Sequence, residues 1–284
     1  MRTLLAVLLL LSQEESWVNP PKDKLAGVEH RTFRSASMKR DVGFAIYLPP
    51  AYASEPAKRF PVVYYLHGMT DCESTHPQLF GILDAAIAKG EVAPIILVYT
   101  MCGRTSWYAD APDGSVMGES VFVKDLVPHV DATFRTVASR EGRAVMGWSM
   151  GGFGALKMGF KHPEFFGSVV SFGGGFVTGE DLKKRRSGQL KKTFGDDPEK
   201  FQEDSPWELS KKNLEKIRDR QPLRLAVGTK DSLLEPNRRM KAFLEDLKLA
   251  PEYEEIEGVG HEPPKVFAAQ GLKALQFHAR HFGK

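Results

Sequence analysis

Short, almost wholly apolar segments recur along this chain, and they constrain its fold more than any other feature. They occupy residues 61–68, 94–100, 143–149, 167–174 and 223–229, each beside or containing a Gly or Pro. Apolar runs of this length predict strands that are buried on both faces. Helical patterns follow them at 79–90, 119–134, 151–161 and 236–248. This alternation predicts an α/β protein with a doubly wound, mostly parallel sheet and helices on both faces.

The flanking segments extend this pattern into a single domain over residues 29–284. Residues 29–41 and 42–49 predict two strands joined by a turn near Arg40 and Asp41. A strand at 252–258 and a helix at 263–282 complete the chain.

The interval 175–220 is polar and predicts an insertion, which is either a partial lid or a surface cap without substrate contact. Its KKRR run at 183–186 is interpreted as a solvated helix face. The chain has 39 basic and 36 acidic residues, a net charge of +3, which gives no electrostatic reason to expect a nucleic acid partner.

Residues 1–16 resemble a secretory signal peptide. Arg2 precedes the apolar run Leu4–Leu11, and polar residues follow at once. The run is shorter than the roughly 20 apolar residues that span a bilayer. We therefore expect a secreted or periplasmic protein whose mature form has no membrane contact. The alternative is an apolar N-terminal element that docks on the core.

Residues 147–151 read Gly-Trp-Ser-Met-Gly, a G-x-S-x-G pattern between a predicted strand and a predicted helix. A nucleophile at the tip of such a turn needs strained backbone angles and small neighbours two residues away on either side. The pattern predicts Ser149 as a catalytic nucleophile. It also directs the Met150 N–H, at the helix N-terminus, towards a developing oxyanion.

A serine nucleophile needs a base and an acid that orients the base. In this kind of sheet they follow the serine in the order acid, then histidine. Asp231 follows the strand 223–229, with Glu235 in the same loop as a weaker alternative, and His261 follows the last strand. The remaining histidines precede Asp231 or fall within the final helix. They are His30, His67, His76, His129, His162, His278 and His281.

The second oxyanion donor is predicted in the loop after residues 61–68. The sequence His67-Gly68-Met69 places the Met69 N–H there, as a partner for the Met150 N–H. We interpret His67 as a structural residue that orients this loop by a hydrogen bond.

Together these motifs resemble the esterase D-type branch of the α/β-hydrolase superfamily. They are LHGMTD (66–71), SWYADAPDGS (106–115), GWSMGGFGA (147–155), GTKD (228–231) and VGH (259–261). The branch includes S-formylglutathione hydrolases, tributyrin-type carboxylesterases, feruloyl and acetyl-xylan esterases, and mycolyltransferases. The resemblance implies the α/β-hydrolase fold, Ser149, Asp231 and His261 as a triad, Met69 and Met150 as oxyanion donors, an acyl ester substrate, and no metal or organic cofactor.

The substrate is less constrained. Trp107 and Tyr108 either stack on an aromatic acyl group or sugar ring, or pack their loop onto the sheet. If the chain is exported, as residues 1–16 predict, the leading hypothesis is a feruloyl or acetyl-xylan type esterase that acts on esters of plant polysaccharides. The alternatives are a short-chain carboxylesterase, an S-formylglutathione hydrolase-like enzyme, an acyltransferase and, remotely, a non-catalytic binding module.

Two cysteines, Cys72 and Cys102, follow strands that are predicted to be neighbours. In an exported protein this placement suggests that they form a disulfide. Neither lies in the G-x-S-x-G turn, which argues against a thiol nucleophile.

Overall fold

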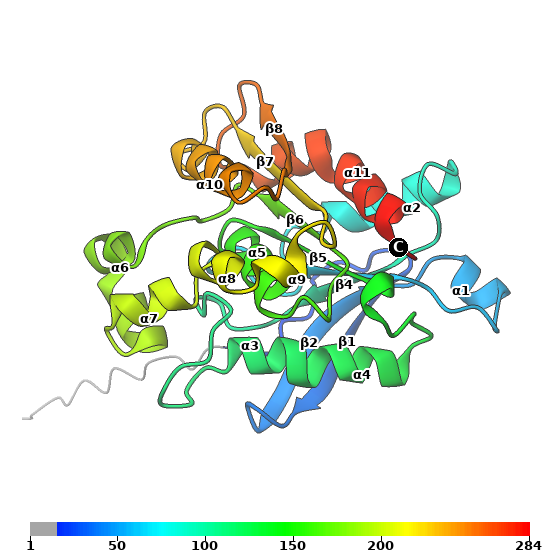
Figure 1. The fold of residues 1–284 in the computed structure, drawn as a ribbon. Helices are drawn as coiled ribbons and strands as arrows, with labels where there is room; N and C mark the ends of the chain where they lie inside the picture. Colours follow the sequence, from blue (N-terminus) through cyan, green and yellow to red (C-terminus); the bar gives the residue numbers. More distant parts are fainter. Residues whose placement is uncertain (1–15) are drawn as a thin grey trace, which may run out of the picture.

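The computed structural model describes residues 16–284 and shows one sheet packed between helices (Figure 1). Residues 1–15 of the predicted signal peptide lie outside the described residues. The strands are β1 (Val28–Ser35), β2 (Arg40–Tyr47), β3 (Val62–Leu66), β4 (Ile96–Thr100), β5 (Arg143–Trp148), β6 (Ser168–Phe172), β7 (Leu223–Gly228) and β8 (Glu252–Ile256). The helices are α1 (Ala51–Ser54), α2 (Gln78–Ala88), α3 (Gly118–Ser120), α4 (Val127–Thr133), α5 (Met150–Lys161), α6 (Gly179–Phe194), α7 (Pro198–Glu203), α8 (Pro206–Lys212), α9 (Leu214–Ile217), α10 (Leu234–Asp246) and α11 (Pro263–His281).

The eight strands form a single sheet in the order β1-β2-β4-β3-β5-β6-β7-β8. β2 pairs antiparallel with both β1 and β4, and all the other pairs are parallel. The mostly parallel sheet predicted from the sequence is therefore confirmed. This order places β5 near the middle of the sheet. The carboxyl ends of β3 and β6 therefore lie on either side of the segment that follows β5.

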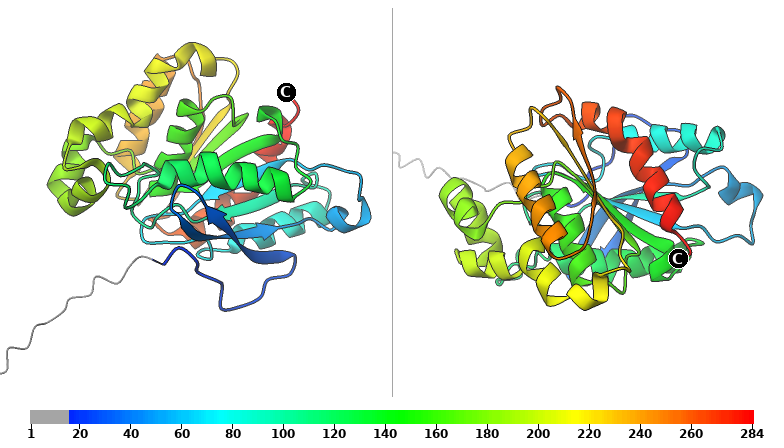
Figure 2. Two further views of the ribbon diagram at one scale, coloured as in Figure 1. Left: turned by 90° about the horizontal axis from the view of Figure 1, so that it is seen from below. Right: turned by 45° about the horizontal axis from the view of Figure 1, so that its top comes forward.

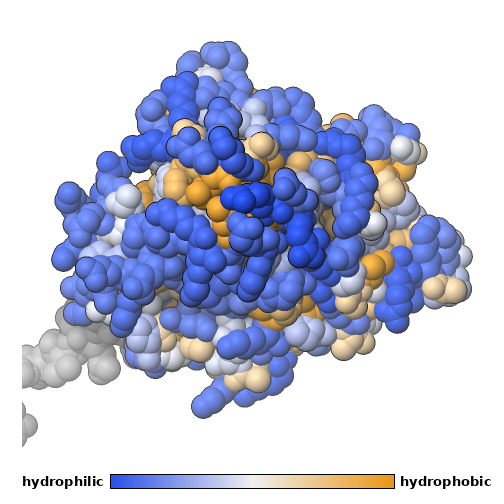
Figure 3. Space-filling model, in the orientation of Figure 1, coloured by the Kyte–Doolittle hydropathy of each residue, from blue (hydrophilic) through white to orange (hydrophobic). Residues whose placement is uncertain are grey.

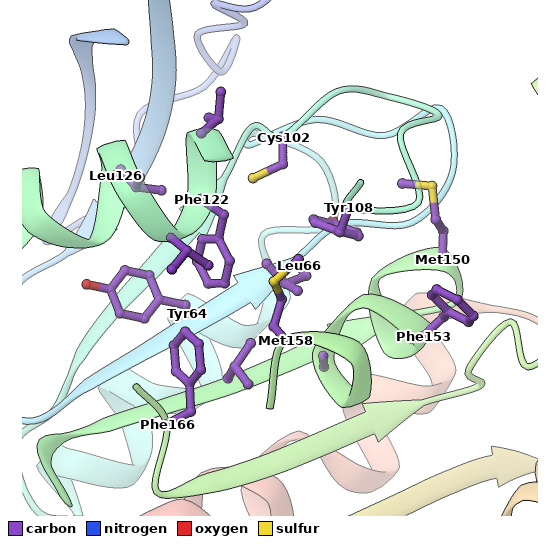
Figure 4. Close-up of a cluster of buried hydrophobic side chains, with 14 of the residues drawn as sticks. Tyr64, Leu66, Cys102, Tyr108, Phe122, Leu126, Met150, Phe153, Met158 and Phe166 are labelled. Carbon is purple, nitrogen blue, oxygen red and sulfur yellow. The ribbon is translucent and has the colours of Figure 1, made fainter. Parts of the chain in front are cut away.

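Helices cover both faces of the sheet, as predicted (Figure 2). One face packs Tyr65, Tyr99 and Met146 against α2 and α11. The other packs Tyr64 and Val145 against α5 and the segment that contains α3 and α4. Figure 4 shows the second cluster, in which Tyr64, Phe122 and Phe166 contact one another as aromatic pairs. Every residue of β3 is buried, which explains the apolar run that predicted it.

The helix predicted over 119–134 is continuous but not uniform. A π-helical stretch, Val121–Leu126, joins α3 to α4. Pro128 lies at the start of α4 and has no N–H to donate. A wider π-helical turn in front of it is one way to accommodate the missing hydrogen bond.

The turn between the first two strands was misplaced by the sequence prediction. β1 ends at Ser35 and β2 begins at Arg40, so the turn spans 36–39 and not Arg40–Asp41. Ser35 Oγ accepts from the Met38 N–H at 3.0 Å and donates to Asp125 at 2.5 Å, and Lys39 has a φ of 55°. No Gly, Asn or Pro marks this turn in the sequence, and the contact of Ser35 with Asp125, which is distant in the chain, helps to hold it.

The predicted insertion folds as α6 to α9 between β6 and β7. Residues 183–186 are exposed, as predicted for a solvated helix face, although α6 is interrupted at Arg186. Hydrophilic residues also dominate the face of the molecule shown in Figure 3. None of the described helices combines the length and apolarity needed to cross a membrane.

The disulfide suggested from the sequence is wrong for this structure. Cys72 and Cys102 are both free and buried. Cys72 Sγ lies 3.4 Å from Ser74 Oγ. Cys102 is fully buried in the cluster of Figure 4, and burial raises its thiol pKa to about 12 although a hydrogen bond with Thr100 opposes the rise. At neutral pH this thiol is protonated and unreactive.

His278 makes the stability of the fold depend on pH. Its ring is fully buried on α11 beside Ser168 Oγ at 2.8 Å, and burial, aided by nearby His281, lowers its pKa to about 3. In the unfolded chain the pKa of His278 is near 6.5. At pH values between 6.5 and the folded pKa, the unfolded chain binds a proton at this residue and the folded chain does not, so the free energy of unfolding falls as pH falls.

We predict that His278 alone removes up to about 2 kcal/mol of stability between pH 7 and pH 5. Urea unfolding at both values measures the difference. His278→Gln should reduce it by that amount, whereas His281→Gln on the same helix should keep most of it. Equal pH dependence in the wild type and in His278→Gln would contradict the prediction.

Candidate active site

Ser149 lies at a sharp turn between β5 and α5. Its backbone has φ 56° and ψ −114°, a conformation that costs a residue with a side chain about 1–3 kcal/mol. Hydrogen bonds on both sides hold it. The Ser149 N–H donates to Phe172 O on β6, and Ser149 O accepts from the N–H groups of Phe153 and Gly175. The predicted strand–turn–helix context of this serine is therefore present.

Two glycines allow the turn to close. A Cβ at Gly147 would lie 2.1 Å from Gly151 O, and a Cβ at Gly151 would lie 1.9 Å from Leu66 O. These atoms belong to backbone and cannot rotate away. The N-terminus of α5 therefore packs directly on β5 and on the end of β3. A side chain at Gly147 would prevent the first contact, and one at Gly151 the second.

Asp231, His261 and Ser149 form a continuous hydrogen-bonded chain. His261 Nδ1 lies 2.7 Å from Asp231 Oδ2, and His261 Nε2 lies 2.9 Å from Ser149 Oγ. A carboxylate only accepts, so Nδ1 carries the proton and Nε2 accepts from the serine hydroxyl. The three residues follow β5, β7 and β8, whose carboxyl ends lie at one edge of the sheet. The structure thus brings together the three residues that the sequence predicted as nucleophile, acid and base.

The acid is shielded from solvent while the base is accessible. The Asp231 side chain is fully buried, and its Oδ1 accepts from the Leu233 N–H at 2.8 Å. The His261 side chain is 34% exposed, and its ring lies 4.3 Å from the Trp148 ring at a 30° interplanar angle. Packing against Trp148 restrains the plane of the His261 ring, and the hydrogen bond with the buried carboxylate orients it.

The other sequence candidates lie elsewhere. Glu235 pairs with Arg238 at 2.7 Å and does not contact His261. Each remaining histidine has a different partner: His30 with Glu73, His76 with Asp71, His129 with Phe33, His162 with Glu119, His278 with Ser168 and His281 with Phe277.

The two predicted oxyanion donors lie on adjoining backbone segments. A Cβ at Gly68 would lie 2.8 Å from Trp148 Cδ1, so the turn that carries Met69 contacts the strand end before Ser149. Among the hydrogen bonds of the described residues, none uses the N–H of Met69 or Met150 as donor. His67 Nδ1 donates to Gly68 O at 2.7 Å, which agrees with the loop-orienting hydrogen bond expected of His67.

Tyr108 is fully buried, so it has no exposed ring face for a ligand. Its hydroxyl donates to His67 O at 2.8 Å, next to the Met69 turn. Of the two roles that the sequence allowed for Tyr108, packing of the loop onto the sheet is therefore the one observed. The expected contact of Tyr108 with substrate is wrong for this structure. Trp107 is 3% exposed and packs edge-on against Phe153 and Phe201. A substrate contact by Trp107 stays a prediction.

The insertion contributes side chains that the sequence did not single out. Gln189 on α6 accepts from Trp107 Nε1 at 3.4 Å and donates to Met69 Sδ at 2.9 Å. Arg186 Nη1 lies 2.8 Å from the same sulfur, at a break in α6 where its own φ is −147° and ψ is 45°. α6 therefore reaches the loops around Ser149. No local pattern could have revealed these contacts, since they join residues far apart in the chain.

The described residues contain no group of three or more His, Cys, Asp or Glu side chains that could hold a metal ion.

Comparisons with known proteins show the family and the fold of this chain. The family model described as "Putative esterase" matches residues 35–270. An esterase of Mycobacterium tuberculosis is 36% identical over 147 residues, which cover 50% of this chain and 31% of that protein. An endo-1,4-beta-xylanase/feruloyl esterase of Xylanibacter ruminicola is 30% identical over 165 residues, covering 55% of this chain and 23% of that protein. This chain thus spans under a third of the length of these relatives.

Solved structures show the same fold. A ferulic acid esterase superposes with a TM-score of 0.79 at 21% identity, covering 90% of this chain and 98% of that one. An S-formylglutathione hydrolase of Staphylococcus aureus superposes with a TM-score of 0.74 at 17% identity. The match covers 89% of this chain and 98% of that one. The fold is that of the α/β-hydrolase esterases, as the sequence resemblance implied.

We predict that Gly151→Ala destabilises the protein by about 3 kcal/mol or prevents folding, because its Cβ would collide with backbone oxygens of 66 and 67. Gly81→Ala on α2 is the matched control. Its Cβ meets nothing within 4 Å, so stability should be unchanged or increase by up to about 1 kcal/mol. Urea unfolding compares the two, and equal midpoints would show that the close approach is not required.

Proposed function

The chain belongs to the "Putative esterase" family, and on that premise we propose that it is a serine carboxylic-ester hydrolase. The observation that carries the proposal is the hydrogen-bonded chain Asp231–His261–Ser149 at the β5–α5 turn. A hydroxyl bonded to an imidazole, which is itself oriented by a buried carboxylate, is an arrangement for nucleophilic attack on an acyl group.

In the proposed mechanism, Ser149 Oγ attacks the ester carbonyl while His261 Nε2 takes its proton. The Met69 and Met150 N–H groups donate to the oxyanion. His261 returns the proton to the leaving alcohol, which leaves an acyl group on Ser149. A water molecule, deprotonated by His261, then attacks the carbonyl of this acyl group. The bond to Ser149 Oγ breaks, His261 returns the proton to that oxygen, and the acid leaves. Asp231 keeps the proton of the imidazole on Nδ1 and stabilises the imidazolium in both steps.

We further propose that the substrates are feruloyl or acetyl esters of plant polysaccharides. The Xylanibacter ruminicola relative is named for xylanase and feruloyl esterase activities, and a ferulic acid esterase has the same fold. We keep Trp107 in this proposal as a residue that borders the acyl group, because its ring edge approaches Gly175, whose N–H donates to Ser149 O. The side chains of Gln189 and Arg186 on α6 contact the Met69 sulfur. We therefore propose that α6 borders the substrate site as a partial lid.

Ser149→Ala should lower kcat by on the order of 10⁴-fold or more on p-nitrophenyl acetate and methyl ferulate. A burst of p-nitrophenol and a Ser149 acyl adduct in the mass spectrum of the wild type should accompany turnover. Ser171→Ala, a buried serine on the adjacent strand β6, is the control and should keep kcat. Wild-type turnover in Ser149→Ala would refute the ester-hydrolase proposal.

A panel of methyl ferulate, acetylated xylan, p-nitrophenyl esters and S-formylglutathione tests the substrate class separately. The polysaccharide-ester proposal requires kcat/KM on methyl ferulate or acetylated xylan to exceed that on S-formylglutathione. The reverse order would leave the hydrolase proposal standing and replace its substrate.

We also propose export, based on the Arg2 and Leu4–Leu11 pattern of the segment 1–16. Expression of the full chain in a bacterial host should give a periplasmic or secreted product that lacks this segment, as measured by intact mass. A cytoplasmic product of full mass would contradict it.

A further inference from the structure

Lys157 on α5 is a fully buried cation that the proposed mechanism does not use. Its Nζ donates to the backbone oxygen of Tyr108 at 2.6 Å. It also pairs with Asp204, which follows α7 in the insertion, and lies 3.5 Å from Glu119 of α3. One ammonium group therefore joins the nucleophile helix, the insertion and the loop that holds Tyr108.

Neighbouring charges balance this buried ammonium. Lys161 pairs with the same two carboxylates, with Glu119 at 2.7 Å and with Asp204 at 2.6 Å, and His162 lies 3.0 Å from Glu119. Burial would raise the pKa of Glu119, but the His162 hydrogen bond and the two lysines outweigh it and lower that pKa well below its usual range. Because Glu119 stays ionised, the cluster keeps its attraction for Lys157 over the whole neutral range.

Tyr108 links this cluster to the oxyanion turn. Trp107 and Tyr108 both have positive φ, 51° and 54°, a conformation that surrounding contacts must hold in non-glycine residues. Lys157 binds the Tyr108 carbonyl, and a Cβ at Gly154 would lie 2.3 Å from the Tyr108 ring, so the ring rests directly on α5. At the far end of the side chain, the Tyr108 hydroxyl donates to His67 O, two residues before Met69.

We propose that Lys157 is a positioning residue for ester hydrolysis: it fixes Tyr108, and through the Tyr108 hydroxyl it sets the Met69 N–H relative to Ser149. This inference rests on the proposed function. An oxyanion donor that shifts by a fraction of an ångström binds the transition state less well but barely changes ground-state binding. Loss of Lys157 should therefore reduce kcat and leave KM nearly unchanged.

The matched control is Lys161, which pairs with the same carboxylates but does not contact Tyr108. With p-nitrophenyl acetate, Lys157→Met should lower kcat about 10- to 100-fold and Tyr108→Phe about 10-fold, with KM within about 3-fold. The double variant should lose no more than Lys157→Met alone, because both changes interrupt one chain of contacts. Lys161→Met should keep kcat even where its urea midpoint falls.

Circular dichroism and urea unfolding establish that each variant is folded. If Lys157→Met does not fold, Tyr108→Phe decides the matter, since it removes only the hydroxyl that reaches His67. A wild-type kcat in Tyr108→Phe, or equal losses of kcat in Lys157→Met and Lys161→Met, would overturn the positioning role. Failure of the proposed function is distinguishable from these results, because it would appear as unchanged turnover in Ser149→Ala.

Discussion

The backbone contact between β3, β5 and α5 is the constraint on which the rest of the site depends. Gly147 and Gly151 lack the Cβ atoms that would lie about 2 Å from backbone oxygens, so the helix can begin directly against the sheet. This approach forces Ser149 into a strained conformation with its side chain at the sheet edge. The backbone energy stored there is balanced by hydrogen bonds from β6 and from the segment after it.

The parallel sheet then supplies the partners of Ser149 without any local sequence link. Asp231 and His261 follow different strands, yet their side chains meet because parallel strands end at the same edge. Burial of the Asp231 carboxylate and packing of the His261 ring on Trp148 limit the freedom of both groups. In the proposed reaction, a site assembled in this way would need little reorganisation.

A second, polar constraint lies behind the site. Lys157, Lys161, Glu119 and Asp204 form a compact ion cluster between α5, α3 and the insertion. A buried ion pair adds little net stability, but loss of one partner leaves an uncompensated charge, so the cluster fixes geometry more than it adds stability. The insertion is thereby attached to the helix that follows Ser149, and α6 extends from it to Met69.

The sequence by itself determined the sheet, its helices and the positions of Ser149, Asp231 and His261, because apolar runs, turn glycines and strand-end loops are local patterns. Only the tertiary structure decided that the first hairpin turns at 36–39, that Cys72 and Cys102 are free, that Tyr108 is buried and that Lys157 and Gln189 reach the site loops. Each of these outcomes depends on contacts between residues far apart in the chain. The energies of these contacts arise from burial and charge pairing, which exist only once the sheet has formed.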